Sequence, residues 1–120
     1  MANTYKNAKV DLTSTGVTTL YTTPAKATSI VKSILVSEDS NNADTITVTI
    51  TDSTAAVFSV FKEKAISAKQ TLELLSAPLV LNTGDILKVT AATGNRLHVI
   101  ASILELSLIH ISEPTRLRRI

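Results

Sequence analysis

One stretch of the sequence alternates without error between threonine and branched aliphatic residues. From Asp44 to Asp52 it reads Asp-Thr-Ile-Thr-Val-Thr-Ile-Thr-Asp, so Ile46, Val48 and Ile50 share one side and threonines the other. A period of two is that of a β-strand with one buried face, and branching at Cβ favours an extended backbone. No segment sustains the 3.6-residue period of an amphipathic helix. The chain is therefore predicted to be all-β.

Turn-forming residues divide the chain into eight or nine short segments of this kind. Pro24 and Asn82–Asp85 are examples, because proline fixes φ and Asn, Gly and Asp favour turns. The expected strands are Thr4–Leu12, Val17–Thr22, Ser29–Ser37, Asp44–Asp52, Val57–Glu63, Thr71–Leu75, Leu79–Leu81, Ile86–Ala91 and Leu97–Leu104. Short strands at regular spacing are typical of a sandwich or jelly roll. We expect one antiparallel β-sandwich or jelly-roll-like domain over residues 1–105.

Residues 106–120 resemble a translated sequencing adapter. Residues 106–116 read Leu-Ser-Leu-Ile-His-Ile-Ser-Glu-Pro-Thr-Arg, which matches a transposase-type library adapter codon by codon, and residues 117–120 fit its continuation. We interpret this segment as a non-native tail and exclude it from reasoning about fold and function. On this interpretation, the native C-terminus beyond Glu105 stays open.

The tail changes the charge balance of the chain. The whole sequence has 12 basic and 10 acidic residues, and the tail supplies three of the former and one of the latter. Nine of each remain in residues 1–105, so this part carries no formal net charge. A basic arm that binds nucleic acid would depend on the tail alone. We therefore expect no nucleic-acid partner.

Several other classes of protein are not indicated. The chain has no cysteine, its apolar runs are far shorter than the roughly 20 residues that span a bilayer, and its first residues lack the pattern of a secretory signal. We expect a soluble protein made in a cytoplasm, without a membrane partner.

The sequence offers little catalytic chemistry. His98 is the one histidine before the tail, and between Leu97 and Val99 it is expected to be a locally hydrogen-bonded side chain of the sheet. The three glycines fit no phosphate-binding motif, and tryptophan is absent. We expect neither an enzyme nor a cofactor, a metal or a small-molecule substrate.

An acidic segment, Glu38–Asp44, is the one oxygen-rich cluster. Calcium needs six to eight oxygen ligands, which such a loop could supply in part. The spacing does not match an EF-hand and the required glycine is missing. We expect a solvated turn whose side chains cap their own backbone, with an ion site as the alternative.

Two predicted strands are apolar on both sides. In the first, Ile30, Ile34 and Val36 are expected on one face and Val31 and Leu35 on the other; the second is expected to place Leu97, Val99 and Ile103 opposite Ile100 and Leu104. A sandwich buries only one face of each sheet. Either the chain itself or another subunit must then cover the second face. The predicted interface consists of Ile30, Val31, Ile34, Leu35, Val36, Leu97, Val99, Ile100, Ile103 and Leu104.

Five stretches of the sequence resemble small virion proteins of tailed bacteriophages, of the kind common in environmental phage sequences. They are Gly16–Ala25, Thr28–Ser37, Ala43–Ile50, Pro78–Val89 and Leu97–Glu105. The resemblance covers most of residues 1–105. The chain departs from the pattern at Lys26, where such proteins usually carry a glycine or a small polar residue.

The resemblance implies a non-enzymatic structural protein of a virion, made in the host cytoplasm. It would decorate the capsid or form part of the tail or tail tip, and its partners would be other virion proteins and copies of itself. A receptor- or glycan-binding sandwich with an ion site at Glu38–Asp44 is the alternative.

Overall fold

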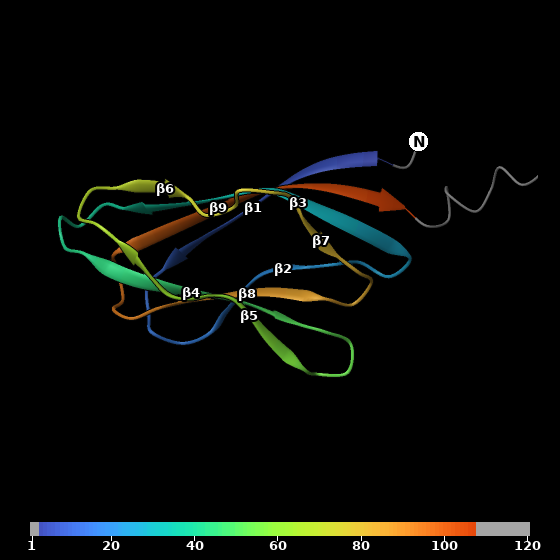
Figure 1. The fold of residues 1–120 in the computed structure, drawn as a ribbon, viewed down its shortest axis with the longest axis horizontal. Helices are drawn as coiled ribbons and strands as arrows, with labels where there is room; N and C mark the ends of the chain where they lie inside the picture. Colours follow the sequence, from blue (N-terminus) through green and yellow to red (C-terminus); the bar gives the residue numbers. More distant parts are fainter. Residues whose placement is uncertain (1–2, 108–120) are drawn as a thin grey trace, which may run out of the picture.

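The computed structural model describes residues 3–107, which form nine β-strands and no helix (Figure 1). The strands are β1 (Asn3–Leu12), β2 (Thr18–Thr22), β3 (Ala27–Glu38), β4 (Asp44–Thr51), β5 (Val57–Ile66), β6 (Thr71–Glu73), β7 (Leu79–Leu81), β8 (Ile86–Ala91) and β9 (Leu97–Ser107). All nine predicted strands are present, with ends that differ by at most three residues. Within the described range, no helix is long and apolar enough to cross a membrane.

The strands form two antiparallel sheets that lie face to face (Figure 1). The first sheet has the order β1-β9-β3-β6, and β7 pairs with β3 beside β6; the second has the order β2-β8-β4-β5. The chain crosses between the sheets at every connection except β4–β5 and β6–β7. The predicted all-β sandwich is confirmed.

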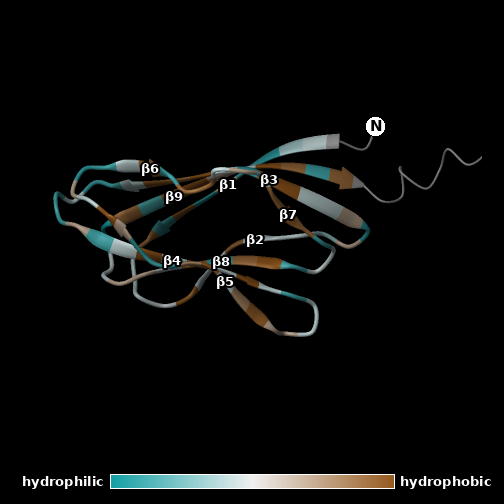
Figure 2. Cartoon of the chain, viewed as in Figure 1, coloured by the Kyte–Doolittle hydropathy of each residue, from teal (hydrophilic) through white to brown (hydrophobic). Residues whose placement is uncertain are grey.

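The core lies between the sheets, and apolar residues concentrate on their central strands (Figure 2). Ile46 and Val48 of β4 are fully buried, and Ile50 packs against the core at its margin. The threonines between them lie on the outer side of the second sheet, so the alternation seen in the sequence translates directly into an inner and an outer face.

A β-bulge at Lys32 interrupts the alternation of β3. Val31 pairs with Ile103, but Ser33 pairs with Ser102, so β3 has one residue more than β9 at this point. After such an insertion the alternation changes phase, so that positions expected to face outward face inward and the reverse. The carboxylate of Glu73 in β6 accepts a hydrogen bond from the Ile34 backbone N–H, at 2.8 Å, next to the bulge.

The predicted faces of β3 were therefore wrong. Val31, Ile34 and Val36 are all fully buried on the inner face, while Ile30 and Leu35 lie on the outer one. The faces of β9 were predicted correctly: Leu97, Val99 and Ile103 are buried, opposite Ile100 and Leu104.

The edges of the sheets differ in regularity. β1 pairs with β9 over its whole length without a register shift, whereas β5 has two shifts against β4 and a left-handed residue, Glu63, at φ 51°. β2 contains one shift, and β6 and β7 have three residues each.

Two further expectations bear on the ends and turns of the chain. Lys26 has a left-handed φ of 60°, a conformation that glycine adopts without strain, which explains the glycine expected at this position. Strand β9 continues through Leu106 and Ser107, the first two residues of the predicted tail. The rest of that tail, with His110, lies outside the described residues.

Candidate functional site

The outer face of the first sheet consists of rows of side chains that cross its strands. In an antiparallel sheet, residues directly opposite each other share a face and lie in contact. The first row, at one end, is polar and contains Asp11, His98, Ser37 and Thr71. The next contains Lys9, Ile100, Leu35 and Glu73, and the third contains Asn7, Ser102 and Ser33.

The fourth row is apolar from one edge of the sheet to the other. This outer apolar row consists of Tyr5 of β1, Leu104 of β9, Ile30 of β3 and Val80 of β7. Tyr5 is 77% exposed and Val80 56% exposed, and the two central residues are partly exposed. Ile100 and Leu35, two rows away, are exposed by 39% and 37%. Tyr5 and Val80 had not been predicted as part of this surface.

Only four of the ten predicted interface residues lie on this surface. They are Ile30, Leu35, Ile100 and Leu104. The other six are at most 1% exposed and contact their own core: Val31, Ile34, Val36, Leu97, Val99 and Ile103. The prediction that this strand pair forms an interface stays a prediction, now limited to the four outward residues.

The outer face of the second sheet has a different chemistry. Thr47 lies opposite Thr90, and Thr49 lies opposite Lys88, at the centre of this face. Together with Val17 and Val57 at the margin, these side chains line an open depression. The centre of the face is hydroxyl-rich and resembles an ordinary solvated sheet surface.

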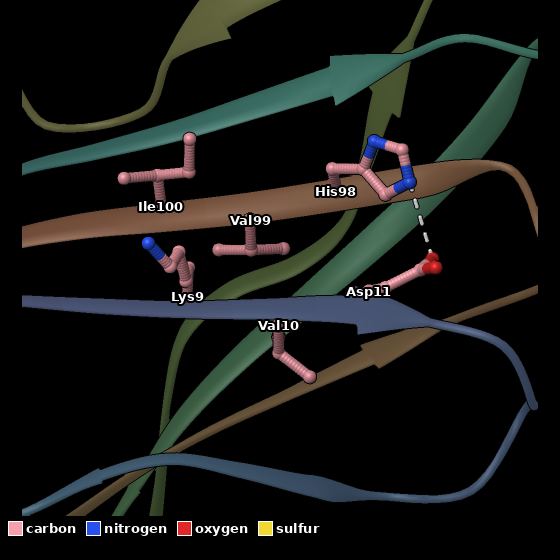
Figure 3. A pocket seen from close by; sticks show the side chains of 6 residues that line it. All are labelled: Lys9, Val10, Asp11, His98, Val99 and Ile100. Atoms are coloured by element: carbon pink, nitrogen blue, oxygen red, sulfur yellow. Dashed lines mark ion pairs between the residues drawn. The ribbon is translucent and has the colours of Figure 1, made fainter.

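His98 lies in an open depression on the first sheet, beside Asp11 (Figure 3). Its Nε2 atom is 3.2 Å from Oδ1 of Asp11, and its Nδ1 atom is 3.4 Å from Oδ2 of Asp39. Ile100 and Lys9 form the neighbouring wall. In the described part of the chain no serine or threonine hydroxyl is hydrogen-bonded to His98. His98 thus lies partly exposed at the surface of the sheet, close to two carboxylates.

The carboxylate of Glu38 organises the loop that follows β3. Glu38 is 2% exposed and accepts hydrogen bonds from the backbone N–H groups of Ser40 (2.8 Å), Asn42 (3.2 Å) and Lys69 (2.8 Å), and from the Ser40 hydroxyl. Burial alone would raise the pKa of Glu38, but these hydrogen bonds outweigh it and lower the pKa to about 2.

Two of the three acidic residues of this loop, Glu38 and Asp44, are thus committed to backbone donors. Asp44 likewise accepts from the backbone N–H groups of Thr45 and Thr93, at 2.8 and 3.1 Å. Among residues 3–107 no group of three or more His, Asp or Glu side chains is placed to hold a metal ion. The arrangement is that of a self-capped turn.

At the other end of the sandwich, a polar network joins the two sheets beneath the outer apolar row. The hydroxyl of Tyr21 in β2 is 2.7 Å from Oγ of the fully buried Ser29 and donates a hydrogen bond to Glu105 in β9. Lys6 of β1 lies 3.6 Å from the same carboxylate. Burial and the contact with Glu105 raise the pKa of Tyr21 to about 12. Tyr21 thus remains protonated and can donate to Glu105 at neutral pH.

Comparison with known proteins adds a fold but no family. No protein-family model and no curated protein matches the chain. Among solved structures, it is similar to a chain from the disulfide-linked pili of Bacillus endospore appendages, at 7% identity and a TM-score of 0.54, covering 89% of both chains. A chain of infectious bursal disease virus, Gx strain, gives 11% identity and a TM-score of 0.53 over 88% of this chain and 32% of that one.

A third similar structure is a pentameric capsid protein isolated from metagenomic phage sequences. It is 19% identical with a TM-score of 0.46, over 88% of this chain and 63% of that one. At these identities the likeness is one of fold.

Proposed function

We propose that this protein is a non-enzymatic structural subunit of a bacteriophage virion and acts through assembly. The observation that carries the proposal is the outer apolar row, which crosses the first sheet from Tyr5 on β1 to Val80 on β7. Contiguous exposed apolar surface is uncommon on proteins that act as monomers and marks interaction sites. We place the contact with neighbouring copies of the chain on this face, in a capsid-decorating layer or in the tail.

The shape of the row suits packing between subunits. A straight row of side chains on a sheet offers a flat surface, without the enclosed hollow that a small ligand needs. Burying a large apolar side chain stabilises a contact by about 1.5–3 kcal/mol. Four such residues, with Ile100 and Leu35 nearby, can therefore supply the centre of an interface between neighbouring subunits.

The remaining sites favour this assignment over chemistry. His98 is partly exposed and its neighbours are two carboxylates, an arrangement without a nucleophile. Glu38 and Asp44 use their oxygens to hold backbone N–H groups. We therefore do not propose an ion-assisted glycan site in this loop. The proposal is in keeping with the sources of the two structures with the higher TM-scores, a pilus and a virus.

The experiment places charge on the outer face without disturbing the core. The variant combines Leu35→Lys and Val80→Lys, both at exposed positions; Leu35 lies opposite Glu73, which would attract the new ammonium group. We expect self-association, measured by sedimentation velocity over a range of concentrations, to weaken at least about tenfold, because two apolar contacts are replaced by solvated charges.

The matched control is Ser59→Lys, an exposed residue on the outer side of the second sheet, opposite Thr49. It adds a lysine and should leave association unchanged. Incorporation into particles should follow the same order. Unchanged association and incorporation of the double variant, or an equal loss in the control, would overturn the proposal.

A further inference from the structure

We infer that the free edge of β1 pairs with β1 of a second copy, in an antiparallel arrangement about a two-fold axis, so that the first sheets of two copies form one continuous sheet. This inference rests on the proposed function as an assembling subunit, but it concerns a different surface. The outer apolar row offers side chains, whereas the edge offers unpaired backbone groups.

β1 is the one long edge of the described residues whose backbone is undistorted. An exposed edge strand presents a row of backbone N–H and C=O groups to any other strand, and natural proteins usually block it with bulges, short length or proline. β1 has ten residues, a continuous register with β9 and no proline. On its other side, no strand in residues 3–107 pairs with it.

The other edges carry such protection. β5 is as long as β1 and, like β1, carries two lysines, but two register shifts and the left-handed Glu63 distort it. β2 is short and contains a register shift, and β6 and β7 have three residues each. The difference between β1 and β5 identifies β1 as the edge that remains suited to pairing.

The charges along β1 select a small number of registers. The cores of both copies should lie on the same side of the joined sheet. An inward-facing residue of one copy must then pair with an inward-facing residue of the other, and an outward-facing residue with an outward-facing one. An axis at Lys6 or Lys9 would place a lysine opposite itself, which is unfavourable. An axis at Asn7 or Ala8 avoids this and pairs nearly the whole strand.

These two registers also bring favourable neighbours together. With the axis at Ala8, Tyr5 lies opposite Asp11 of the second copy and Asn7 opposite Lys9 of the second copy. With the axis at Asn7, Tyr5 lies opposite Lys9 of the second copy, where a cation can contact its ring. Either way, Tyr5 faces a charged residue of the second copy, so the outer apolar rows of the two copies lie on opposite sides of the axis and remain available for other contacts.

A second contact is required for assembly beyond a dimer. A two-fold contact uses the same patch on both partners and closes once it has formed. A subunit that builds a larger particle therefore needs another surface besides it. The β1 edge and the outer apolar row supply two such surfaces on one sheet.

The test uses the absence of cysteine from the chain. Asn7→Cys and Ala8→Cys each place one thiol at a candidate axis, and Ser59→Cys places one on the distorted β5 edge as a control. Residues that face each other in an antiparallel pair have Cα atoms about 4.5–5.5 Å apart, within the range that a disulfide bridges.

Under mild oxidation, we expect one of the two β1 variants to form a covalent dimer at least about tenfold faster than Ser59→Cys, because pairing raises the effective thiol concentration to the millimolar range. Non-reducing electrophoresis and mass measurement give the rates. Equal rates at β1 and β5 would overturn the inference. So would cross-linking that requires removal of residues 108–120, because the chain's own tail would then occupy the edge.

A charge variant separates edge pairing from packing through the outer face. Asn7→Lys opposes a lysine to a lysine in both candidate registers, whereas Ser102→Lys adds the same charge in the same row, one strand inward on β9. In the register centred on Ala8, we expect Asn7→Lys to slow the Ala8→Cys cross-link at least about fivefold and Ser102→Lys to leave it unchanged. An equal effect of both would overturn the inference.

The two proposals fail in distinguishable ways. If only the function proposed for the outer face is wrong, Leu35→Lys with Val80→Lys leaves association unchanged while the β1 cross-link still forms. If only the edge inference is wrong, the cross-link is missing while the double variant still weakens association.

Discussion

The two sheets share one construction on their inner sides and differ on their outer sides. Both bury regular rows of Val, Ile and Leu against each other, but outside the second sheet presents Thr47, Thr49, Thr51 and Thr90, and the first presents the outer apolar row. Folding alone does not require apolar side chains on an outer face, because the second sheet folds with hydroxyl groups at the corresponding outward positions. The difference supports the proposed contact with another subunit.

The second sheet is not free of exposed apolar residues, but their placement is different. Val57 and Phe58 are 62% and 57% exposed and lie in the β4–β5 hairpin, which projects from the body of the sandwich (Figure 1). Scattered exposed residues of this kind are normal on protein surfaces. An apolar row that runs from one edge of a sheet to the other is not normal. The contrast between the two outer faces can be tested with single substitutions.

The largest effect should separate the inner from the outer side of β3. Val31→Glu places a carboxylate in the core, where Val31 is fully buried, and should cost about 4 kcal/mol or more of unfolding free energy. Leu35→Lys, on the outer side of the same strand, should change it by less than about 0.5 kcal/mol. Urea unfolding followed by circular dichroism measures both. A stable Val31→Glu protein would contradict the inward placement of Val31.

A smaller effect should come from the link between the sheets. Tyr21→Phe removes the hydroxyl that contacts Ser29 and Glu105, and we expect a loss of about 1–2 kcal/mol because Ser29 is fully buried. Tyr5→Phe, on the outer apolar row, is the matched control and should be nearly neutral. If both variants are neutral in thermal unfolding, the network does not hold the first sheet against the second.

Acid should affect the end of the first sheet that Glu38 organises. The folded pKa of Glu38, about 2, is below the ordinary value of 4.5. Its contribution to stability is therefore complete above about pH 4.5 and is lost as the pH falls from there toward 2. Glu38→Gln should melt a few degrees lower than wild type at neutral pH, and this difference in melting temperature should disappear as the pH falls through this window. A difference that does not depend on pH would exclude the carboxylate as its cause.

The smallest effect should come from making the second sheet more like the first. Thr51 lies between Ile86 and Val57, so Thr51→Val would make three neighbouring residues of this row apolar with little change in shape. We expect unchanged folding and a weak additional self-association at high concentration in sedimentation experiments. Thr49→Val, beside Lys88, is the control and should not associate. Association of both would show that one added apolar residue suffices anywhere.

The strands could be predicted from the sequence because their signals are local. Alternation in β4 and the turn residues before β3 and β8 depend on residues close in the chain, and all nine strands appear where expected. The sandwich follows, since strands with one apolar face must pair their faces.

The surface could be predicted only in part because it depends on distant partners. The bulge at Lys32 is stabilised by Glu73 from another strand. The residues next to Lys32 in the sequence contain no signal that predicts it. Tyr5 and Val80 join the outer apolar row through pairings with β9 and β3, and the Glu38 carboxylate accepts one of its hydrogen bonds from the distant Lys69 backbone. A polar loop and two isolated apolar residues gave no sign of these contacts.

The extra residue in β3 makes that strand sensitive to length rather than to identity. Many side chains should be acceptable at Lys32, which is exposed, but its deletion would restore strict alternation and turn either Ser29 and Val31 or Ile34 and Val36 toward the solvent. Homologous chains would be free to vary the residue and unable to lose the position. In an alignment of homologous chains, the absence of a gap at position 32 is thus a sharper sign of common ancestry than any single conserved residue.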